Sequence, residues 1–192
     1  EVCGKRIGED TAGWSVGRLG EIADITSGKR PNKKEAAKSN EFPIPIIGAS
    51  SVMGYTKESL YDSPILVIGR VGTHGVVQRF SELCWPSDNT LVITSKFYEF
   101  VYHILKSINY KNLNRGSTQP LITQTDIQNT KIIIPDTEIL DKYEKEVGAL
   151  MNYRFNTIIQ SRALAAIRDA LLPKLMSGEI EAGVSFVPDG GT

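Results

Sequence analysis

The chain has 192 residues, of which 41% are hydrophobic and 23% are charged, and its 22 Lys and Arg balance its 22 Asp and Glu at pH 7. This composition is typical of a soluble globular protein with one domain or a domain plus an extension. The sequence contains no run of 18 apolar residues, the length that a membrane-spanning helix needs. Two Cys and two His make neither a disulfide framework nor a closed zinc site. We therefore expect no metal, no cofactor and no membrane partner, and a reducing cytoplasm as the location.

Charge is distributed unevenly along the chain. Residues 1–134 carry 16 Lys and Arg against 13 Asp and Glu, whereas residues 135–192 carry 6 against 9. The first segment has an excess of three positive charges and the second an excess of three negative charges. We therefore expect an anionic partner to bind the first segment.

The N-terminal part of the chain predicts short strands separated by turns. Residues 1–13 have no periodicity and are expected to form a lead-in. Residues 14–28 predict a short strand, a turn and a second short element. Residues 29–40, KRPNKKEAAKSN, predict a polar, basic loop. Residues 42–56 predict an extended segment, because Pro and Gly interrupt closely spaced apolar residues.

The central part of the chain predicts three further strands and a helix. Residues 63–72 give the strongest strand signal, a β-branched run bounded by Pro and Gly. Two more strands are expected within residues 74–80 and residues 84–95. Residues 96–110 change to the spacing of three and four that is typical of one helical face.

A polar loop and a strand precede the last segment. Residues 111–123 predict the loop, and residues 126–135 end in a strand that Pro135 terminates. From Thr137 onwards the sequence predicts one long helix, with acidic residues near its start. Pro173 is expected to kink or end this helix, and Gly178 to stop it.

The long helix carries an apolar stripe that a compact domain cannot cover. About 36 residues form a rod of roughly 54 Å, so we expect part of the stripe to project and to pack on a partner helix. The candidate interface residues recur at intervals of three and four over most of the helix: Leu140, Tyr143, Val147, Leu150, Ile158, Leu164, Ile167, Leu171 and Leu175.

Catalytic motifs are absent from the sequence. Gly69, Gly72 and Gly75 are spaced by three and precede a strand-like segment, so they do not match the dinucleotide-binding fingerprint. No phosphate-binding loop ending in Gly-Lys-Ser/Thr and no nucleophile elbow occurs. Cys84 lies in the apolar stretch LCWP and is expected in the core, and His103 is expected on the surface or packed rather than as a ligand. We expect no catalytic residues.

Four polar loops lie between the predicted elements, at residues 29–34, 70–74, 87–90 and 112–119. Their side chains are of the types that contact phosphates and base edges of DNA. Taken alone, each loop could be a solvated turn, and Arg70 could instead anchor a carboxylate inside the domain. Together the four loops favour DNA. The candidate DNA-binding residues are Lys29, Arg30, Lys33, Lys34, Arg70, Thr73, His74, Asn89, Asn114, Arg115, Ser117, Thr118 and Gln119.

Roles within this set follow from side-chain type. We expect five residues to contact phosphates: Lys29, Arg30, Lys33, Lys34 and Arg115. The candidates for base reading are Thr73, His74, Asn114, Ser117, Thr118 and Gln119. Arg70 could do either.

Five stretches resemble successive signatures of the DNA-specificity subunit of type I restriction-modification systems. They are GWSVGRLGEIADITSGKRP, ILVIGRVGTHGVV, CWPSDNTLVI, GSTQPLITQTDIQNTKIIIP and RDALLPKLMSGEI, and they extend from about Trp14 to Ile180. The resemblance implies an α/β or α+β fold, with a mixed twisted sheet in a target-recognition domain and a long C-terminal helix. It also implies that catalysis resides in partner subunits.

The chain departs from this family in carrying one recognition domain and one helix, where two of each in tandem are usual. It is either a half-length subunit or one half of a full-length one. We therefore expect double-stranded DNA, modification subunits and a restriction subunit as partners, together with a second copy or second half bound through an antiparallel coiled coil. A two-fold symmetric pair should read a palindromic, interrupted site.

The expected organisation is a lead-in at residues 1–13, a target-recognition domain at residues 14–136, the long helix at residues 137–178 and a tail at residues 179–192. Two other functions stay open at this point. One is a small DNA methyltransferase or nuclease fragment with its own catalysis. The other is a structural coiled-coil adaptor.

Overall fold

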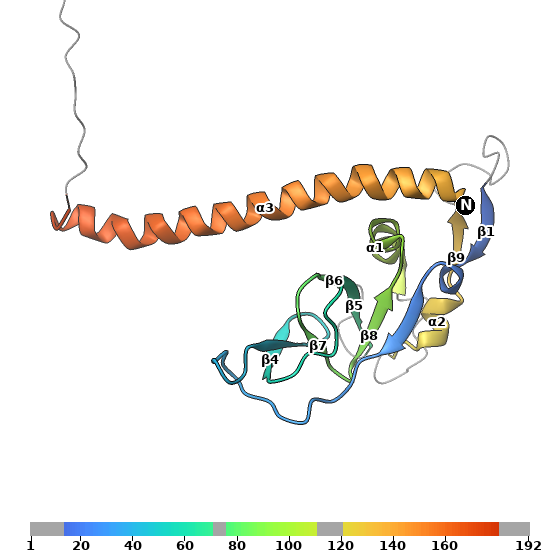
Figure 1. Ribbon diagram of the computed structural model, residues 1–192, viewed down its shortest axis with the longest axis horizontal. Coiled ribbons are helices and arrows are strands. Elements are labelled where there is room, and N and C mark those ends of the chain that lie inside the picture. Colours follow the sequence, from blue (N-terminus) through green and yellow to red (C-terminus); the bar gives the residue numbers. More distant parts are fainter. Residues whose placement is uncertain (1–13, 71–75, 111–120, 181–192) are drawn as a thin grey trace, which may run out of the picture. The chain divides into compact units, whose positions relative to one another are not determined.

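The computed structural model describes residues 14–70, 76–110 and 121–180 (Figure 1). The chain divides into two compact units, Glu1–Val147 and Gly148–Thr192. The first unit contains all the described strands and the shorter helices, and the second is the greater part of one long helix. The predicted boundary after residue 136 stays a prediction, while the first turns of the long helix group with the first unit.

A four-stranded antiparallel sheet forms the centre of the first unit. Its strands are β2 (Asp24–Ser27), β8 (Thr90–Thr94), β5 (Ile65–Gly69) and β6 (Val77–Phe80), in the order β2-β8-β5-β6. All five residues of β5 are buried, which explains why this strand is apolar throughout instead of alternating. The strand predicted most strongly by the sequence is thus one of the two central strands.

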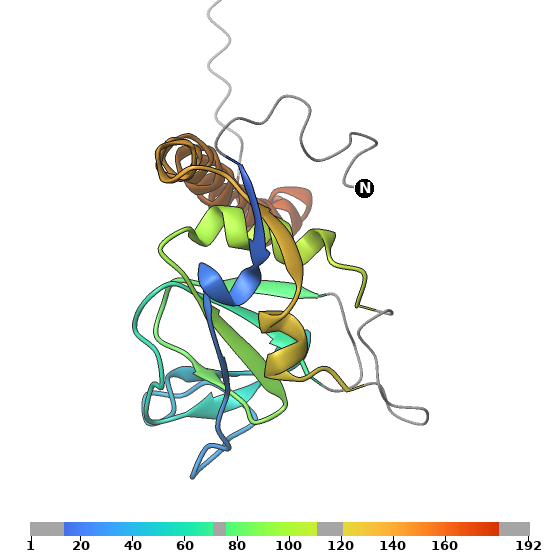
Figure 2. The same cartoon turned by 90° about the vertical axis from the view of Figure 1, so that its right-hand side faces the viewer.

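Two smaller sheets complete the first unit. Strands β4 (Val52–Thr56), β3 (Ile44–Ile47) and β7 (Trp85–Pro86) form the second sheet, in which β3 and β7 are parallel. The third pairs β1 (Ser15–Arg18) with β9 (Lys131–Ile134), as Figure 2 shows. The strands therefore form three sheets where one mixed sheet was expected, because the short strands are separated by turns that reorient the chain.

Three helical elements accompany the sheets in the first unit. The helix predicted over residues 96–110 is α1 (Tyr98–Ser107), which buries Val101, Tyr102 and Leu105. A 3-10 turn, η1 (Leu19–Glu21), follows β1, and α2 (Gln124–Gln128) precedes β9. The α2 helix was not predicted, because its residues fall between the expected polar loop and the expected strand.

The long helix α3 spans Thr137–Met176, close to the predicted range. The helix continues through Pro173 for three residues, so Pro173 does not end it, and a kink at Pro173 stays a prediction. Residues around Pro173 are exposed, and water can satisfy the carbonyl that the missing N–H leaves unpaired. Gly178 stops the helix with φ +73, as expected for a helix C-terminus.

The burial of Cys84 and of Leu140 tests two predictions made from the sequence. Cys84 is fully buried in the cluster formed with Ile47, Ile65 and Val92, which confirms it as a core residue. Leu140 is 2% exposed and belongs to the core of the first unit. Leu140 is therefore not available to a partner helix, and its assignment to the interface is corrected.

Candidate nucleic-acid interface

The loops that carry the predicted binding residues leave from one end of the four-stranded sheet. Ser27 at the end of β2 lies opposite Leu91 near the start of β8, and Gly69 at the end of β5 lies opposite Thr90. The antiparallel register therefore brings together the loop after β2, the loop before β8 and the start of the loop after β5. We call this end of the sheet the loop end.

The basic loop is tied directly to the turn before β8. The N–H of Lys29 donates to the carbonyl of Pro86 at 2.9 Å, and the N–H of Gly28 donates to the carbonyl of Thr90 at 3.1 Å. The indole Nε1 of Trp85 donates to the carbonyl of Lys29 at 2.7 Å. Trp85, which is not among the candidate DNA-binding residues, thus fixes the base of the basic loop.

Gly28 is required by this close approach. A Cβ atom at residue 28 would collide with the carbonyl oxygens of Ser87 and Pro86. Only glycine lets the backbone of the basic loop run this close to the neighbouring turn.

Arg70 joins the turn before β8 to the segment that precedes α2. Its N–H donates to the carbonyl of Asn89 at 2.9 Å, and its carbonyl accepts from the N–H of Ile122 at 3.0 Å. The side chain of Gln124 donates to Ser27 Oγ at 2.8 Å, which links the start of α2 to the end of β2. The described flanks of all four predicted loops therefore meet at the loop end.

The polar and charged side chains at the loop end differ in their exposure and in whether they have an interaction partner. Lys29 and Asn89 are exposed. Arg30 is also exposed and pairs with Asp88 at 3.3 Å, an ion pair that water screens strongly. Arg70 is half-buried, and its Nε is buried without a hydrogen-bond partner among the described residues.

Lys33 and Lys34 lie beside the β3-β4-β7 sheet instead. Lys33 lines a pocket of about 260 Å³ together with Thr56, Lys57 and Trp85, and Asn32 and Glu58 complete its lining. The aliphatic stem of Lys34 packs over Gly54 in β4. Lys57 is paired with Glu41, so this pocket has little net charge.

Seven of the candidate residues lie outside the described residues. They are Thr73, His74, Asn114, Arg115, Ser117, Thr118 and Gln119. Their roles stay predictions.

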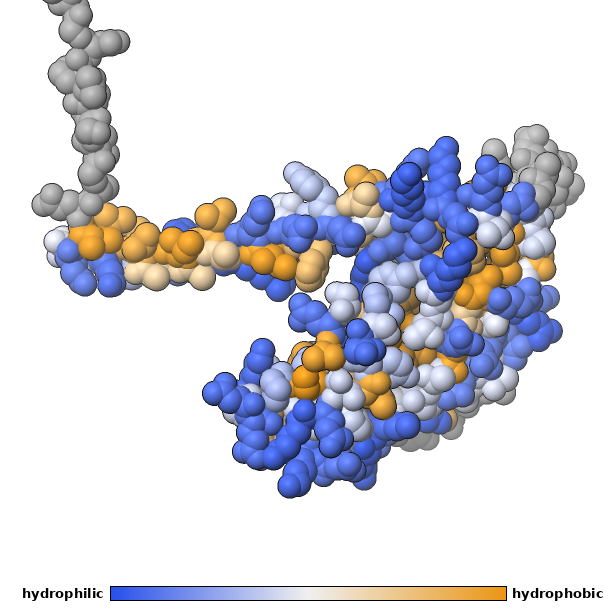
Figure 3. Space-filling view, in the orientation of Figure 1, coloured by the Kyte–Doolittle hydropathy of each residue, from blue (hydrophilic) through white to orange (hydrophobic). Residues whose placement is uncertain are grey.

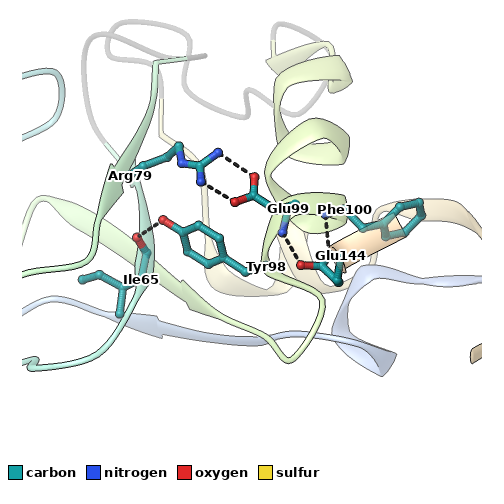
Figure 4. A network of polar contacts seen from close by, with 6 residues as sticks. All are labelled: Ile65, Arg79, Tyr98, Glu99, Phe100 and Glu144. Atoms are coloured by element: carbon teal, nitrogen blue, oxygen red, sulfur yellow. Dashed lines mark hydrogen bonds and ion pairs between the residues drawn. The ribbon is translucent and has the colours of Figure 1, made fainter. Parts of the chain in front are cut away.

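A separate polar network lies at the opposite end of the sheet (Figure 4). The guanidinium of Arg79 in β6 forms two hydrogen bonds with the Glu99 carboxylate, one of them at 2.6 Å, and stacks between the rings of Tyr98 and Tyr102. The carboxylate of Glu144 in α3 accepts from two backbone N–H groups at the start of α1. This network holds α1 and the beginning of α3 against the sheet. The cation in it, Arg79, already has an acidic partner in Glu99.

Burial shifts several pKa values in the first unit. It raises the pKa of the Cys84 thiol to about 11 and that of Tyr98 to about 12, where Arg79 opposes the shift. For Arg79, burial lowers the pKa, but the hydrogen bond and charge of Glu99 outweigh it and the net direction is upward. Cys84 is therefore a protonated core thiol at neutral pH.

No metal or membrane feature emerges from the part of the chain that the structure describes. Within it, no three His, Cys, Asp or Glu side chains are grouped so that they could hold a metal ion, and no helix has the length and apolarity needed to cross a membrane. His103 is exposed and contacts the edges of the Tyr102 and Tyr143 rings.

The second unit exposes large apolar side chains along α3 (Figure 3). Leu150 is 67% exposed and Leu164 is 66% exposed, values far above those of core residues. Of the predicted interface residues, Tyr143 and Val147 are half-buried in the first unit. The remaining ones are exposed: Leu150, Ile158, Leu164, Ile167, Leu171 and Leu175.

Comparisons with known proteins agree on one family. The model of the type I restriction modification DNA specificity domain matches residues 11–161. The chain is 30% identical over 196 residues to the type I restriction enzyme MjaIX specificity subunit of Methanocaldococcus jannaschii, covering 88% of this chain and 44% of that protein. It is 27% identical over 199 residues to the HindI specificity subunit of Haemophilus influenzae, covering 88% and 42%.

Solved structures support the fold. The S subunit of a type I restriction-modification system from M. genitalium has a TM-score of 0.72 at 15% identity, covering 90% of this chain and 48% of that one. A chain from a study of complex assembly in the type I R-M system has a TM-score of 0.50 at 20% identity, covering 88% and 47%. The predicted class, an α+β domain followed by a long C-terminal helix, is confirmed.

These findings define a specificity-type recognition domain. The chain belongs to the type I restriction-modification DNA specificity domain family, as the sequence resemblance predicted. It spans less than half the length of the two specificity subunits described above.

Proposed function

We propose that the chain recognises one half-site of a bipartite DNA target through its loop end and directs methylation and cleavage by partner subunits, without a catalytic step of its own. One observation carries this proposal: the described flanks of four loops distant in sequence are joined by hydrogen bonds at one end of the β2-β8-β5-β6 sheet. A rigid sheet that presents several polar loops together is suited to contacting phosphates and base edges at once. Family membership supports the same role.

We also propose that α3 binds two kinds of partner, because apolar side chains are exposed around most of its circumference. Five of them lie within a stripe about 60° wide: Leu150, Tyr153, Leu164, Leu171 and Leu175. The others lie outside this stripe: Phe155, Ile158, Ile159, Ile167, Leu172 and Met176. The stripe would pack on the helix of a second copy or second half, and the apolar residues outside it on the modification subunits.

Charge along α3 favours antiparallel pairing with a second copy. Residues 137–147 carry four acidic and two basic side chains, whereas residues 148–176 carry four basic and one acidic. An antiparallel arrangement sets the acidic part of each helix against the basic part of the other, which a parallel arrangement does not. The pair would bring two loop ends to two half-sites, in the cytoplasm where DNA is modified.

DNA binding by the assembled complex tests the recognition role. Replacing both Lys29 and Arg30 by Ala should lower affinity and reduce the slope of log K against log salt by up to about 0.9 for each phosphate that is no longer neutralised. The matched control replaces Lys96 and Lys106, two exposed lysines that follow the opposite end of β8. Equal losses in both double variants would contradict the proposal.

Mapping of methylated sites in DNA modified by the complex tests the bipartite target. A complex with two copies of this chain should methylate a palindromic, interrupted sequence. A continuous or asymmetric site would contradict self-pairing but not DNA recognition. Methyl transfer by the isolated chain with cofactor added would contradict the absence of catalysis.

A further inference from the structure

Arg70 is held rigidly from both sides by the loops around it. Its N–H and its carbonyl are bonded to Asn89 and Ile122 at 2.9 and 3.0 Å. Its position follows directly from β5, whose residues are all buried. The point from which its side chain projects is therefore fixed before any ligand binds, which lowers the ordering cost of a contact made there.

One nitrogen of the half-buried Arg70 guanidinium lacks a hydrogen-bond partner among the described residues. This nitrogen, Nε, is buried. Arg79, by contrast, pairs with Glu99. Among the described residues, no Asp or Glu forms an ion pair with Arg70. A recessed cation without an acidic partner is costly, which favours an anionic ligand over an internal carboxylate as the partner of Arg70.

The surroundings of Arg70 favour a ligand that protrudes toward the protein. Arg70 is half-buried, while Arg30 has 84% of its side chain exposed and Asn89 is also exposed. Base edges lie at the floor of a groove roughly 8.5 Å deep and are reached by side chains that project. Phosphates project from the duplex, and an Arg fork matches their oxygens.

We propose that Arg70 is a phosphate anchor: a positioning residue that binds a DNA phosphate whatever the neighbouring bases are. This inference rests on the proposed function, and it assigns to Arg70 one of the two roles that its residue type allows. The phosphate contact would set the register of the loop end on the duplex, and the surrounding loops would supply base discrimination.

The test uses the assembled complex with Arg70→Gln and Arg70→Lys. The probes are a duplex bearing the complex's methylation site and a series of duplexes with single base-pair changes in that site. Arg70→Gln should weaken binding to every duplex by the same factor, about tenfold, and reduce the salt slope by about 0.9. Arg70→Lys should keep most of the slope, because the charge remains.

Two results would overturn the inference. A changed ranking of the duplexes at one base pair would identify Arg70 as a base-reading residue, and an unchanged affinity and slope would exclude a DNA contact. If thermal denaturation shows that Arg70→Gln does not fold, Arg70→Met takes its place with the same expected losses, because it also removes the charge. Loss of the salt slope in Arg70→Lys would count against a phosphate anchor. Failure of the unaltered complex to bind DNA would instead refute the proposed function.

Discussion

The carboxylate of Glu144 in α3 accepts a hydrogen bond of 2.8 Å from the backbone N–H of Phe100 in α1. It also accepts from the N–H of Glu99 at 3.0 Å. Phe97, at the N-cap position of α1, provides no side-chain cap, so a residue distant in sequence caps this helix. The first turns of α3 are thereby an integral part of the first unit.

Removing this cap should destabilise the first unit. Glu144→Ala leaves two N–H groups of α1 without an acceptor, and we expect a loss of about 1 kcal/mol in the free energy of unfolding. Urea denaturation followed by circular dichroism measures the change. Glu146→Ala, also in α3 but exposed, is the control, and an equal loss in both variants would refute the capping role.

The pair formed by Arg79 and Glu99 should contribute more. Glu99 has 7% of its side chain exposed, so Arg79→Met leaves a buried carboxylate without its partner and should cost about 3 kcal/mol. Lys96→Met removes a cation from a pair with Asp141 in which the side chains are 69% and 53% exposed, and should change stability by less than about 1 kcal/mol. Similar losses of stability in Arg79→Met and Lys96→Met would contradict the burial of the Glu99 carboxylate.

Local patterns predicted the individual elements well. A continuous apolar run identified β5, because both sides of this strand are buried. Spacings of three and four identified α1 and α3, because one side of a helix that packs on other elements is apolar. The α2 helix was missed since five residues are too few for a period, although Thr123 and Asp126 form a capping box that could have signalled it.

The meeting of the four loops could not be derived from sequence. It depends on β8 pairing with both β2 and β5, and which strands pair is decided by packing between distant segments. The same holds for Glu144, whose sequence context is that of an ordinary surface residue until α1 is placed beside it. Lys33 and Lys34 were grouped with Lys29 because they share a loop, yet that loop is long enough to place them beside a different sheet.

Cys84 should resist thiol reagents in the folded protein. The thiolate is the reactive form, and a pKa of about 11 keeps the thiol protonated at pH 8, so the reaction rate should rise with pH up to about that value. We expect slow labelling of a Cys3→Ser variant by a chromogenic disulfide reagent at pH 8 and rapid labelling in denaturant. Fast labelling of the folded variant would contradict the burial of Cys84.

Self-pairing through α3 should depend on its apolar face. Leu164→Glu combined with Leu171→Glu places charges on that face and should shift sedimentation of the chain at micromolar concentration toward the monomer. Ala166→Glu adds a charge at an exposed position about 150° around the helix from Leu164 and Leu171 and should leave the sedimentation unchanged. If the unaltered chain sediments as a monomer, self-pairing is contradicted altogether.

The most direct measurement of whether the loop end faces DNA is photocross-linking from defined positions of the assembled complex. A photoreactive amino acid would replace Asn89, at the loop end, or Lys96, beyond the opposite end of β8. Cross-links to a duplex bearing the methylation site should form from position 89 and not from position 96. Cross-links from position 96 alone would show that the opposite end of the sheet meets the duplex.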